Sequence, residues 1–332
     1  MEEEPLLRVE HLVKYFPVYD RGVLLRKKIG DVHAVDDISI SIGHGETLGL
    51  VGESGCGKTT AGKTMMNLEE PNSGSVFFEG KDLYKTLRSG KTTEARYLRR
   101  NIQMVFQNPY GSLDPRMTVF DIISEPFIIH GNIPRRVWRE KVYDLLKLVG
   151  LEEYHAERYP HEFSGGQRQR ISIARALATS PKFIVADEPV SSLDVSIRAQ
   201  ILNLLEDLQK KTGVSFLYIS HDLSSVRQIS TKVAVMYLGK IFEYAPTDKL
   251  FEKPLNPYTI ALLAAVPVPD PDRQINRIVL AGDVPSPVNP PSGCRFHPRC
   301  PYAVDICKTE EPVLREVQED HFVACHLAEK FM

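Results

Sequence analysis

The segment from Thr47 to Thr59 constrains this chain more than any other. Thr47-Leu48-Gly49-Leu50-Val51 is a short apolar run, and Gly52-Glu53-Ser54-Gly55-Cys56-Gly57-Lys58-Thr59 follows it directly. Such a run is typical of a strand buried on both faces of a parallel sheet, and the residues after the loop favour a helix to about residue 68. The loop matches the pattern G-x-x-x-x-G-K-[ST] at every position and has the flanking strand and helix that the pattern requires. The segment therefore predicts a phosphate-binding loop in an α/β domain.

The chemistry of this loop follows from its residue types. Glycines let the backbone curl until successive N–H groups point at phosphate oxygens, and the helix N-terminus adds a partial positive charge. Lys58 brings a full charge, and the Thr59 hydroxyl is a ligand for Mg²⁺. The thiol of Cys56 occupies an unconstrained position of the pattern, so we expect that it only packs. The residues expected to hold the nucleotide are Gly52, Ser54, Gly55, Cys56, Gly57, Lys58, Thr59 and Thr60.

Strand and helix signals alternate along most of the chain. Strands are indicated at 6–12, 38–42, 76–78, 102–106, 183–186, 214–219 and 233–237, and helical periodicity at 118–151, 171–177 and 196–211. The basic segment 18–32 is interpreted as an exposed loop or insertion. Long helices between apolar strands are typical of a parallel sheet in an α/β domain.

Two carboxylates end the apolar run at 183–186. Ligands gather at the carboxyl ends of parallel strands, so we expect Asp187 and Glu188 beside the phosphate-binding loop. Asp187 is suited to hold Mg²⁺, and Glu188 is suited to polarise the attacking water as general base. Acidic residues at strand ends are also common surface turns, so the assignment depends on the loop.

A glycine pair at the start of a helix forms a second candidate anion site. In Phe163-Ser164-Gly165-Gly166-Gln167 the serine is a helix N-cap, and the glycines expose the N–H groups of the first turn. The same residues also fit an ordinary N-cap that binds nothing. Gln107 and His221, taken alone, are ordinary polar residues near strand ends.

Over residues 6–250 the chain resembles the nucleotide-binding subunit of an ATP-binding cassette (ABC) transporter. Several separate motifs in the order of that family argue against a chance match. The matching residues are Gly52 to Thr59 for the Walker A loop, Gln107 for the Q-loop, Ser164 to Gln167 for the signature, Ile184 to Glu188 for Walker B, Ser192 to Asp194 for the D-loop, and His221 for the switch histidine.

The resemblance implies an ABC-type P-loop NTPase with a RecA-like core, an antiparallel β subdomain and a helical subdomain at about 110–180. Two subunits would form a head-to-tail dimer, with ATP between the Walker A loop of one and the signature residues Ser164, Gly165, Gly166 and Gln167 of the other. The resemblance also implies the remaining roles: catalysis by Glu188, His221 and Gln107, Mg²⁺ binding by Thr59, Gln107 and Asp187, and Asp194 at the nucleotide.

An aromatic residue of this family stacks on adenine, and Phe16 aligns best, with Tyr15 adjacent. The segment 18–32 departs from the compact family pattern. A core aromatic is therefore the competing interpretation of Phe16.

The tail differs in composition from the rest of the chain. Eleven of the 23 prolines fall between Pro254 and Pro301, and four of the five cysteines (Cys294, Cys300, Cys307 and Cys325) lie in the last 39 residues. Cytosolic thiols are usually reduced, so a disulfide framework is not expected. The gaps are wider than the C-x₂₋₄-C pairs of zinc sites and favour four thiolates around a [4Fe–4S] cluster. Zinc, with His297, His321 or His326 as a substitute ligand, and unligated thiols are the alternatives.

This tail is similar to the C-terminal extension of the oligopeptide and dipeptide importer branch, which commonly carries a four-cysteine cluster. The matching runs are Pro254 to Thr259, Gly293 to Pro301 and, after the Q-loop, Asn108 to Arg116. We therefore divide the chain into a cassette at 1–253 and an extension at 254–332. The cluster would be a structural staple for a segment too proline-rich to build its own core; redox sensing is the alternative.

Composition and charge set the expected location. The chain has 332 residues, and 41 basic against 43 acidic residues give a net charge of −2, which is no reason to expect nucleic acid as a partner. No apolar run reaches the roughly 18 residues that cross a bilayer, and the acidic start differs from a signal peptide. We expect a peripheral protein at the cytoplasmic face of the membrane.

The resulting hypothesis is an ATPase subunit that powers import of di- or oligopeptides, with nickel or oligosaccharides as alternative substrates. Its partners would be two permeases, a second related ATPase subunit or a second copy, and indirectly an extracytoplasmic peptide-binding protein. The alternative class is a soluble ABC ATPase acting on nucleic acid, but the interval from Lys58 to Ser164 lacks sustained heptads. A non-enzymatic ATP binder is disfavoured because Glu188 is present.

Overall fold

The computed structural model describes residues 4–20, 27–90, 92–131, 133–265 and 282–332. The chain forms two compact units, and neither is continuous in sequence. The first unit consists of Met1–Leu6, Ile42–Thr47 and Phe78–Ile219, and the second consists of Leu7–Ser41, Leu48–Phe77 and Ser220–Met332.

The parallel strands of the first unit run in the order β8-β7-β6. They are β6 (Ile102–Val105), β7 (Phe183–Asp187) and β8 (Ser215–Ser220). Phe183 lies opposite Ile102 on one side and Ser215 on the other. Every residue of β7 and β8 is buried, which explains why both are nearly unbroken apolar runs in the sequence. The strands predicted at 102–106, 183–186 and 214–219 are confirmed to within one residue.

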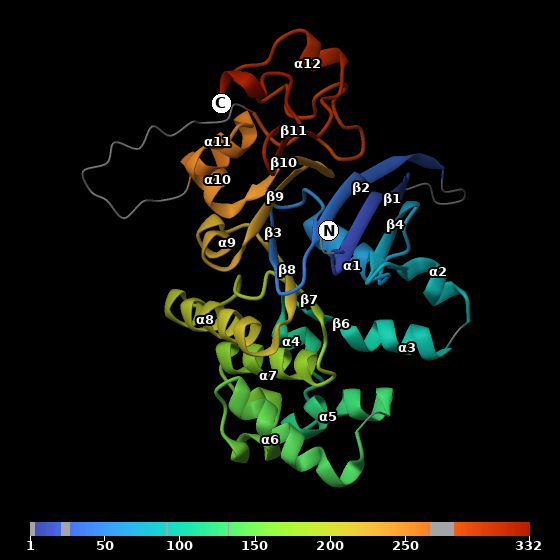
Figure 1. The fold of residues 1–332 in the computed structure, drawn as a ribbon, viewed down its shortest axis with the longest axis vertical. Coiled ribbons are helices and arrows are strands. Elements are labelled where there is room, and N and C mark those ends of the chain that lie inside the picture. Colours follow the sequence, from blue (N-terminus) through green and yellow to red (C-terminus); the bar gives the residue numbers. More distant parts are fainter. Residues whose placement is uncertain (1–3, 21–26, 91, 132, 266–281) are drawn as a thin grey trace, which may run out of the picture. The chain divides into compact units, whose positions relative to one another are not determined.

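Helices α5, α6 and α7 of the first unit pack together (Figure 1). Helix α6 buries Val142 and Leu146, one turn apart, as the helical period predicts. None of the helices in the described part of the chain combines the length and apolar character needed to span a bilayer.

The remaining elements of the first unit include short helices and a short strand that the sequence pattern did not predict. In chain order the bounds are β5 (Lys81–Asp82), α2 (Leu83–Arg88), α3 (Thr92–Asn101), α4 (Pro109–Ser112), α5 (Val119–His130), η1 (Arg135–Val137), α6 (Trp138–Leu148), η2 (Glu153–Glu157), η3 (Pro160–Glu162), α7 (Gly165–Leu177) and α8 (Val195–Thr212).

One sheet of the second unit runs in the order β11-β12-β10-β9-β3. Strand β3 (Thr47–Val51) is parallel to β9 (Lys232–Tyr237), whereas β10 (Lys240–Pro246) is antiparallel to both β9 and β12 (His321–Val323), and β11 (Arg315–Gln318) is antiparallel to β12. The strands predicted at 47–51 and 233–237 are confirmed; β10, β11 and β12 were not predicted. The helices of this unit are α1 (Lys58–Met65), α9 (Leu223–Ile229), α10 (Thr247–Glu252), α11 (Pro257–Ala264), α12 (Ile306–Thr309) and η4 (Ala328–Lys330).

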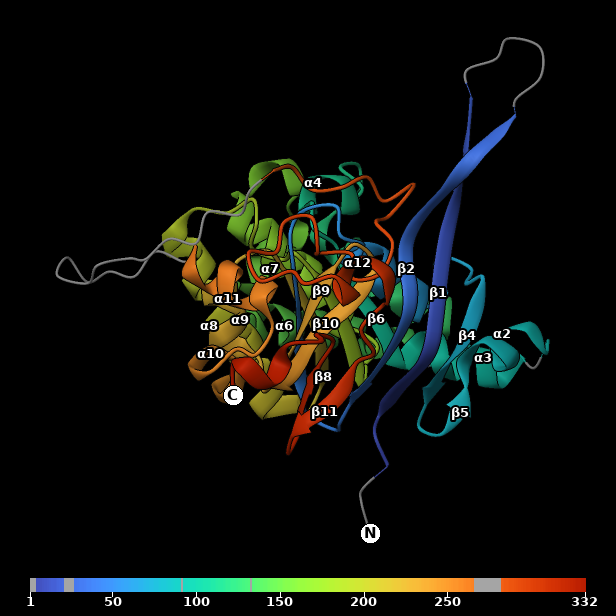
Figure 2. The ribbon, with the colours of Figure 1, turned by 90° about the horizontal axis from the view of Figure 1, so that it is seen from above.

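A second sheet of this unit contains the long strands β1 (Leu7–Tyr19) and β2 (Lys28–Ile42), with β4 (Ser73–Phe78), in the order β2-β1-β4 (Figure 2). The interpretation of 18–32 as a loop is wrong at both ends, because β1 continues to Tyr19 and β2 begins at Lys28; residues 21–26 lie outside the described residues. Backbone pairing continues there without an apolar side-chain pattern. The N–H of Asp20 donates to the carbonyl of Lys27 at 2.9 Å.

The tail is attached to this unit through β12 and a buried carboxylate. The side chain of Glu243 on β10 has no exposed surface and accepts hydrogen bonds from the N–H groups of Leu255 (2.7 Å) and Asn256 (3.1 Å). Its Oε1 also lies 2.7 Å from Nε2 of His321. These contacts link both ends of the tail to one strand.

Leu255, Val323 and Ala328 are fully buried and form a small apolar cluster, against which Phe331 packs. This cluster of three buried residues leaves the statement that the tail is too proline-rich to build its own core a prediction. Pairing of β12 with β10 brings these side chains together.

Candidate nucleotide and cysteine sites

The phosphate-binding loop, residues 52–59, joins β3 to α1 in the second unit. A Cβ atom on Gly52 would lie 2.1 Å from the carbonyl oxygen of Met236, and one on Gly57 would lie 1.9 Å from that of Ala34. Gly57 also has a φ of +110°, which residues with side chains rarely adopt. Glycine at these positions therefore lets the neighbouring backbone approach the loop closely and allows the loop to curl.

Lys58 lies inside this curl, with only 5% of its surface exposed. Its Nζ donates to the carbonyls of Gly52 at 2.8 Å and Glu53 at 3.0 Å. Cys56 is buried, and this burial raises the pKa of its thiol despite the nearby charge of Lys58. Thr59 and Thr60 stand in the first turn of α1 and are half-buried.

Two more of the predicted nucleotide residues belong to the second unit. His221 is exposed directly after β8. Phe16 is half-buried on β1, and Nζ of Lys14 lies 4.7 Å from the centre of its ring. The neighbouring Tyr15 stacks on His33 at 4.1 Å and donates to Asp36 at 2.6 Å. The ring of Tyr15 is thus engaged in a contact of its own.

The first unit brings Gln107 and Glu188 together at the carboxyl end of β7. Nε2 of Gln107 donates to the Glu188 carboxylate at 2.9 Å. Glu188 has a φ of +46°, and its N–H donates to the carbonyl of Ile219 at 2.9 Å while its carbonyl accepts from the Ser191 hydroxyl at 3.0 Å. A left-handed non-glycine residue held in this way stores strain, which is common at functional sites. The preceding Asp187 is 3% exposed.

The signature residues begin α7 in the same unit. Ser164 and Gln167 form a reciprocal cap, because the serine hydroxyl accepts from the Gln167 N–H (3.4 Å) and the glutamine Oε1 accepts from the Ser164 N–H (3.1 Å). Gly165 follows the cap and is half-buried. A Cβ on the buried Gly166 would lie 2.4 Å from Ile197 of α8, so this glycine also serves helix packing.

Asp194 lies before α8 and is exposed, and its side chain makes no capping hydrogen bond. Gln107, Asp187, Glu188, the signature residues and Asp194 thus belong to the first unit, whereas the phosphate-binding loop, Phe16 and His221 belong to the second.

The four tail cysteines line one cavity of about 20 Å³ in the second unit, together with His297 and His326. The sulfur of Cys325 accepts a hydrogen bond from the backbone N–H of Leu327 at 3.3 Å. Burial nevertheless raises the pKa of Cys294 to about 12 and that of Cys325 to about 11. Metal binding at these thiols would therefore release protons.

Among the described residues, no group of three or more His, Cys, Asp and Glu side chains is arranged to hold a metal ion. The four sulfurs that meet at one cavity nevertheless have the donor chemistry of an iron–sulfur site. A cluster is larger than a single ion and needs its ligands further apart. The residues present thus match a cluster in the number and the chemistry of their sulfurs.

No motif pointed to Arg295 and Arg299, which pair with Asp36 and Glu53 in the second unit. Both arginines lie in the run Gly293 to Pro301 that resembles the importer extension, but the resemblance gave them no role.

A phosphate-binding loop shaped by glycines and a strand-end carboxylate that accepts a hydrogen bond from a glutamine are features of the ABC class of ATPases. Comparison with known proteins supports this class. The family described as ABC transporter matches residues 35–191. The family described as Oligopeptide/dipeptide transporter, C-terminal region, matches residues 242–307, which include three of the four tail cysteines.

The similarity extends over nearly the whole chain. The oligopeptide transport ATP-binding protein AppF of Bacillus subtilis is 53% identical over 98% of both chains. A probable peptide ABC transporter ATP-binding protein of Sinorhizobium fredii is 52% identical over 98% of this chain and 90% of its own. A solved dimeric ATP-binding cassette with ADP and phosphate has a TM-score of 0.62 and 26% identity, over 73% of this chain and 98% of its own. The chain belongs to the ATPase subunits of the oligopeptide/dipeptide ABC transporter family.

Proposed function

We propose that this protein hydrolyses ATP to power the import of di- or oligopeptides. The observation that carries hydrolysis is the 2.9 Å hydrogen bond from Gln107 to the carboxylate of Glu188. A carboxylate oriented at the end of a parallel strand is suited to accept a proton from the attacking water. Peptide import is supported by the full-length similarity to oligopeptide and peptide transport ATP-binding proteins.

Different residues of this chain contact different parts of the nucleotide. The backbone of Gly52 to Thr60 surrounds the phosphates, Lys58 neutralises their charge and Phe16 stacks on the adenine. Thr59, Asp187 and Gln107 would be the ligands of Mg²⁺, which would supply charge neutralisation at the phosphates. His221 contacts the γ-phosphate. Ser164 to Gln167 of the second ATPase subunit present the N-terminus of α7 to the same nucleotide, with Asp194 nearby.

Our proposal also includes a docking site for the permeases at the cytoplasmic face of the membrane. An open groove of about 710 Å³ between α5 and α6 is lined by Phe120, Ile128, Ile129 and Trp138. Ile128 and Ile129 are 65% and 64% exposed. Apolar side chains gathered at the surface in this way favour an interaction site, and a short cytoplasmic helix of the permease would cover them.

We infer that the extension, 254–332, holds a [4Fe–4S] cluster through Cys294, Cys300, Cys307 and Cys325. The inference is supported by the shared cavity and by the N–H···S hydrogen bond from Leu327 to Cys325, an interaction that tunes such clusters. When bound, the cluster would cross-link the segment from Cys294 to Cys307 to the segment around Cys325. Zinc is the alternative occupant.

Glu188→Gln tests hydrolysis, because glutamine keeps the shape of the side chain but cannot accept the proton. ATPase activity of the assembled transporter should fall at least about a hundredfold while ATP affinity is retained. Glu153→Gln, at an exposed ion pair with Lys147 in the same unit, is the matched control. An unchanged rate in Glu188→Gln would exclude this residue as the base.

Uptake assays with the assembled transporter test the substrate. A labelled dipeptide and a labelled oligopeptide should enter vesicles in an ATP-dependent manner. Uptake of nickel or an oligosaccharide without peptide uptake would overturn the peptide assignment.

Ile129→Asp tests the groove. The variant should lose co-purification with the permeases and keep its own ATP affinity, because a charge would have to be desolvated on docking. Val313→Asp, at a 76% exposed apolar residue of the tail, is the control. Equal co-purification of both variants contradicts the docking site.

Metal analysis of anaerobically purified protein tests the cluster. The expected result is a broad brown absorption and about four irons per chain. Cys300→Ser should lower the iron content, whereas Cys56→Ser, at the fifth cysteine, should not. Stoichiometric zinc without iron would replace the cluster with a zinc site.

A further inference from the structure

The loop from Cys294 to Cys300 contacts the phosphate-binding loop within the second unit. Arg299 donates from Nη1 to Oε2 of Glu53 at 2.7 Å and from Nη2 to Oε1 at 3.1 Å. Only 8% of the Arg299 side chain is exposed, and a bidentate pair of this kind is both strong and directional. Hydrogen bonding to Glu53 raises the pKa of Arg299, so the guanidinium keeps its charge.

Glu53 is the second residue of the phosphate-binding loop, and the tail also holds its backbone. Its N–H donates to the hydroxyl of Tyr258 at 3.0 Å, while its carbonyl accepts from Lys58. Tyr258 is fully buried, and its ring centre lies 5.3 Å from that of Phe296, which belongs to the Cys294–Cys300 loop. Tyr258 thus holds the backbone of Glu53, Arg299 holds its carboxylate, and Lys58 contacts its carbonyl.

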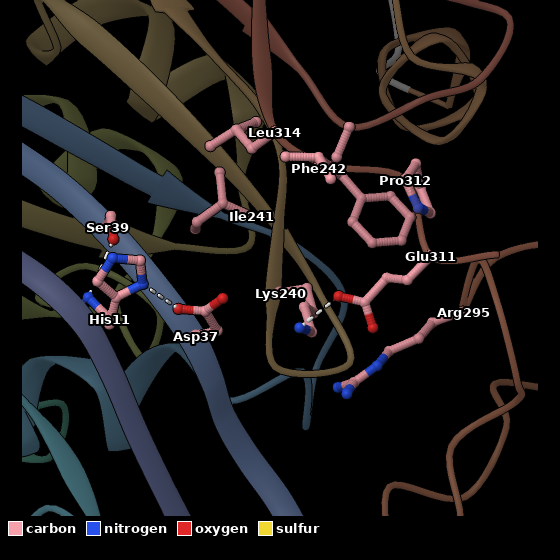
Figure 3. Close-up of a pocket in the computed structure, with 12 residues that line it drawn as sticks. His11, Asp37, Ser39, Lys240, Ile241, Phe242, Arg295, Glu311, Pro312 and Leu314 are labelled. Atoms are coloured by element: carbon pink, nitrogen blue, oxygen red, sulfur yellow. Dashed lines mark hydrogen bonds and ion pairs between the residues drawn. The ribbon is translucent and has the colours of Figure 1, made fainter.

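The other arginine of this loop reaches the phosphate-binding loop by a second route. Arg295 donates to the carbonyl of Leu238 and to Asp36. The N–H of Gly239, the next residue, donates to the carbonyl of Cys56 at 2.9 Å. Arg295 borders a pocket of about 440 Å³, in which Lys240 and Glu311 form an ion pair of 2.5 Å (Figure 3).

We propose that the Cys294–Cys300 loop positions the phosphate-binding loop, so that occupancy of the four-cysteine site strengthens nucleotide binding. The proposal rests on the proposed nucleotide and cysteine sites and assigns them a mutual regulation. Arg299 and Tyr258 are positioning residues, since they act through Glu53.

The coupling has a simple physical origin. Arg299 is adjacent to Cys300, and Arg295 is adjacent to Cys294. A group that binds both cysteines restricts the loop and therefore both arginines. The phosphate-binding loop then loses less conformational entropy when nucleotide binds. By reciprocity, nucleotide must strengthen retention of the group at the cysteines by the same factor.

Arg299→Ala in the full chain tests the positioning role. The dissociation constant for ATP should rise about tenfold, and KM for ATP should rise with little change in kcat. A merely structural defect would instead lower the active fraction and leave KM unchanged. Arg299→Lys, which keeps the charge but not the bidentate geometry, should give an intermediate value. Arg315→Ala, at the exposed ion pair with Glu329, is the matched control and should leave ATP affinity unchanged.

Nucleotide protection of the cysteines tests the coupling. ATP should slow the release of iron to a chelator in the wild-type protein and, in metal-free protein, slow alkylation of Cys300. Arg299→Ala, measured at saturating ATP, should weaken both effects, because only the route through Arg295 and the contact of Tyr258 remain. Unchanged ATP affinity in Arg299→Ala, or no effect of ATP on the cysteines of the wild type, overturns the proposal.

Lys58→Ala distinguishes a wrong nucleotide site from a wrong positioning role of Arg299. Lys58→Ala should abolish ATP binding regardless of the tail. If Lys58→Ala binds ATP like the wild type, the nucleotide site itself is misassigned. If Lys58→Ala fails to bind while Arg299→Ala binds normally, only the positioning role is wrong.

Discussion

The phosphate-binding loop and the four-cysteine tail are candidate ligand sites in the same unit, but they are built in opposite ways. The loop draws its donors from consecutive residues, and two glycines whose Cβ atoms would collide with backbone oxygens shape it. The tail draws its sulfurs from positions between Cys294 and Cys325, and its assembly depends on anchors such as Glu243. A site formed by consecutive backbone groups can be recognised in the sequence as a motif. A site formed by side chains far apart in the sequence is assembled only by the fold around it.

Gly57→Ala should disrupt the loop and give the largest effect on ATP affinity. Its Cβ would meet the Ala34 carbonyl at 1.9 Å in a backbone with φ of +110°. We expect ATP affinity to fall about a hundredfold, which corresponds to about 3 kcal/mol. Titration with a fluorescent ATP analogue, beside circular dichroism to check folding, measures it.

Gly55→Ala is the matched comparison for that variant. Gly55 also has a positive φ, of +79°, but a Cβ there would meet nothing within 4 Å. Its backbone strain is about 1–2 kcal/mol, so the loss of affinity should be smaller. Equal losses in the two variants would show that backbone conformation, and not the close approach to Ala34, governs the loop.

Glu243→Ala should detach the tail while leaving the loop sequence intact. The change leaves the N–H groups of Leu255 and Asn256 and the ring of His321 without their buried acceptor. Unfolding in urea should show a loss of about 3–5 kcal/mol. Glu329→Ala, at an exposed ion pair of the tail, is the control, and a similar loss in both variants would contradict the anchoring role.

Asp36 offers a smaller test of the tail than Glu243 and a more selective one, because Arg295 of the tail stabilises its charge. Burial opposes ionisation, but the hydrogen bond from Tyr15 and the charges of Arg295 and Lys240 outweigh it and lower the pKa of Asp36 to about 2. A folded-state pKa below the unfolded value adds stability that is present above about pH 4 and is lost as the pH falls through about 2.

The variant that isolates this effect is Asp36→Asn. It should cost about 2 kcal/mol at pH 7, and its deficit relative to the wild type should shrink between pH 4 and pH 2. Urea unfolding at several pH values measures the difference. A deficit that stays constant with pH would mean that the charge of Asp36 contributes nothing.

Local patterns predicted the strands and helices that carry the motifs. Strands β3 and β7 are apolar because they are buried on both faces, and the glycines of the loop are required by the backbone itself. The extension of β1 to Tyr19 was missed because backbone pairing there needs no apolar pattern. Strand β10 was missed partly because Glu243 looks exposed in the sequence, whereas the fold buries it as a hydrogen-bond acceptor.

The sequence by itself determined the phosphate-binding loop, the acidic end of β7 and the four cysteines, since residue type and short spacing specify each of them. Only the tertiary structure decided that Gln107 meets Glu188, that the cysteines share one cavity, and that Arg299 pairs with Glu53. The physical reason is the sequence separation between the residues that interact. Backbone conformation and strand burial depend on neighbouring residues, whereas an ion pair between residues 53 and 299 exists only after the intervening chain has folded.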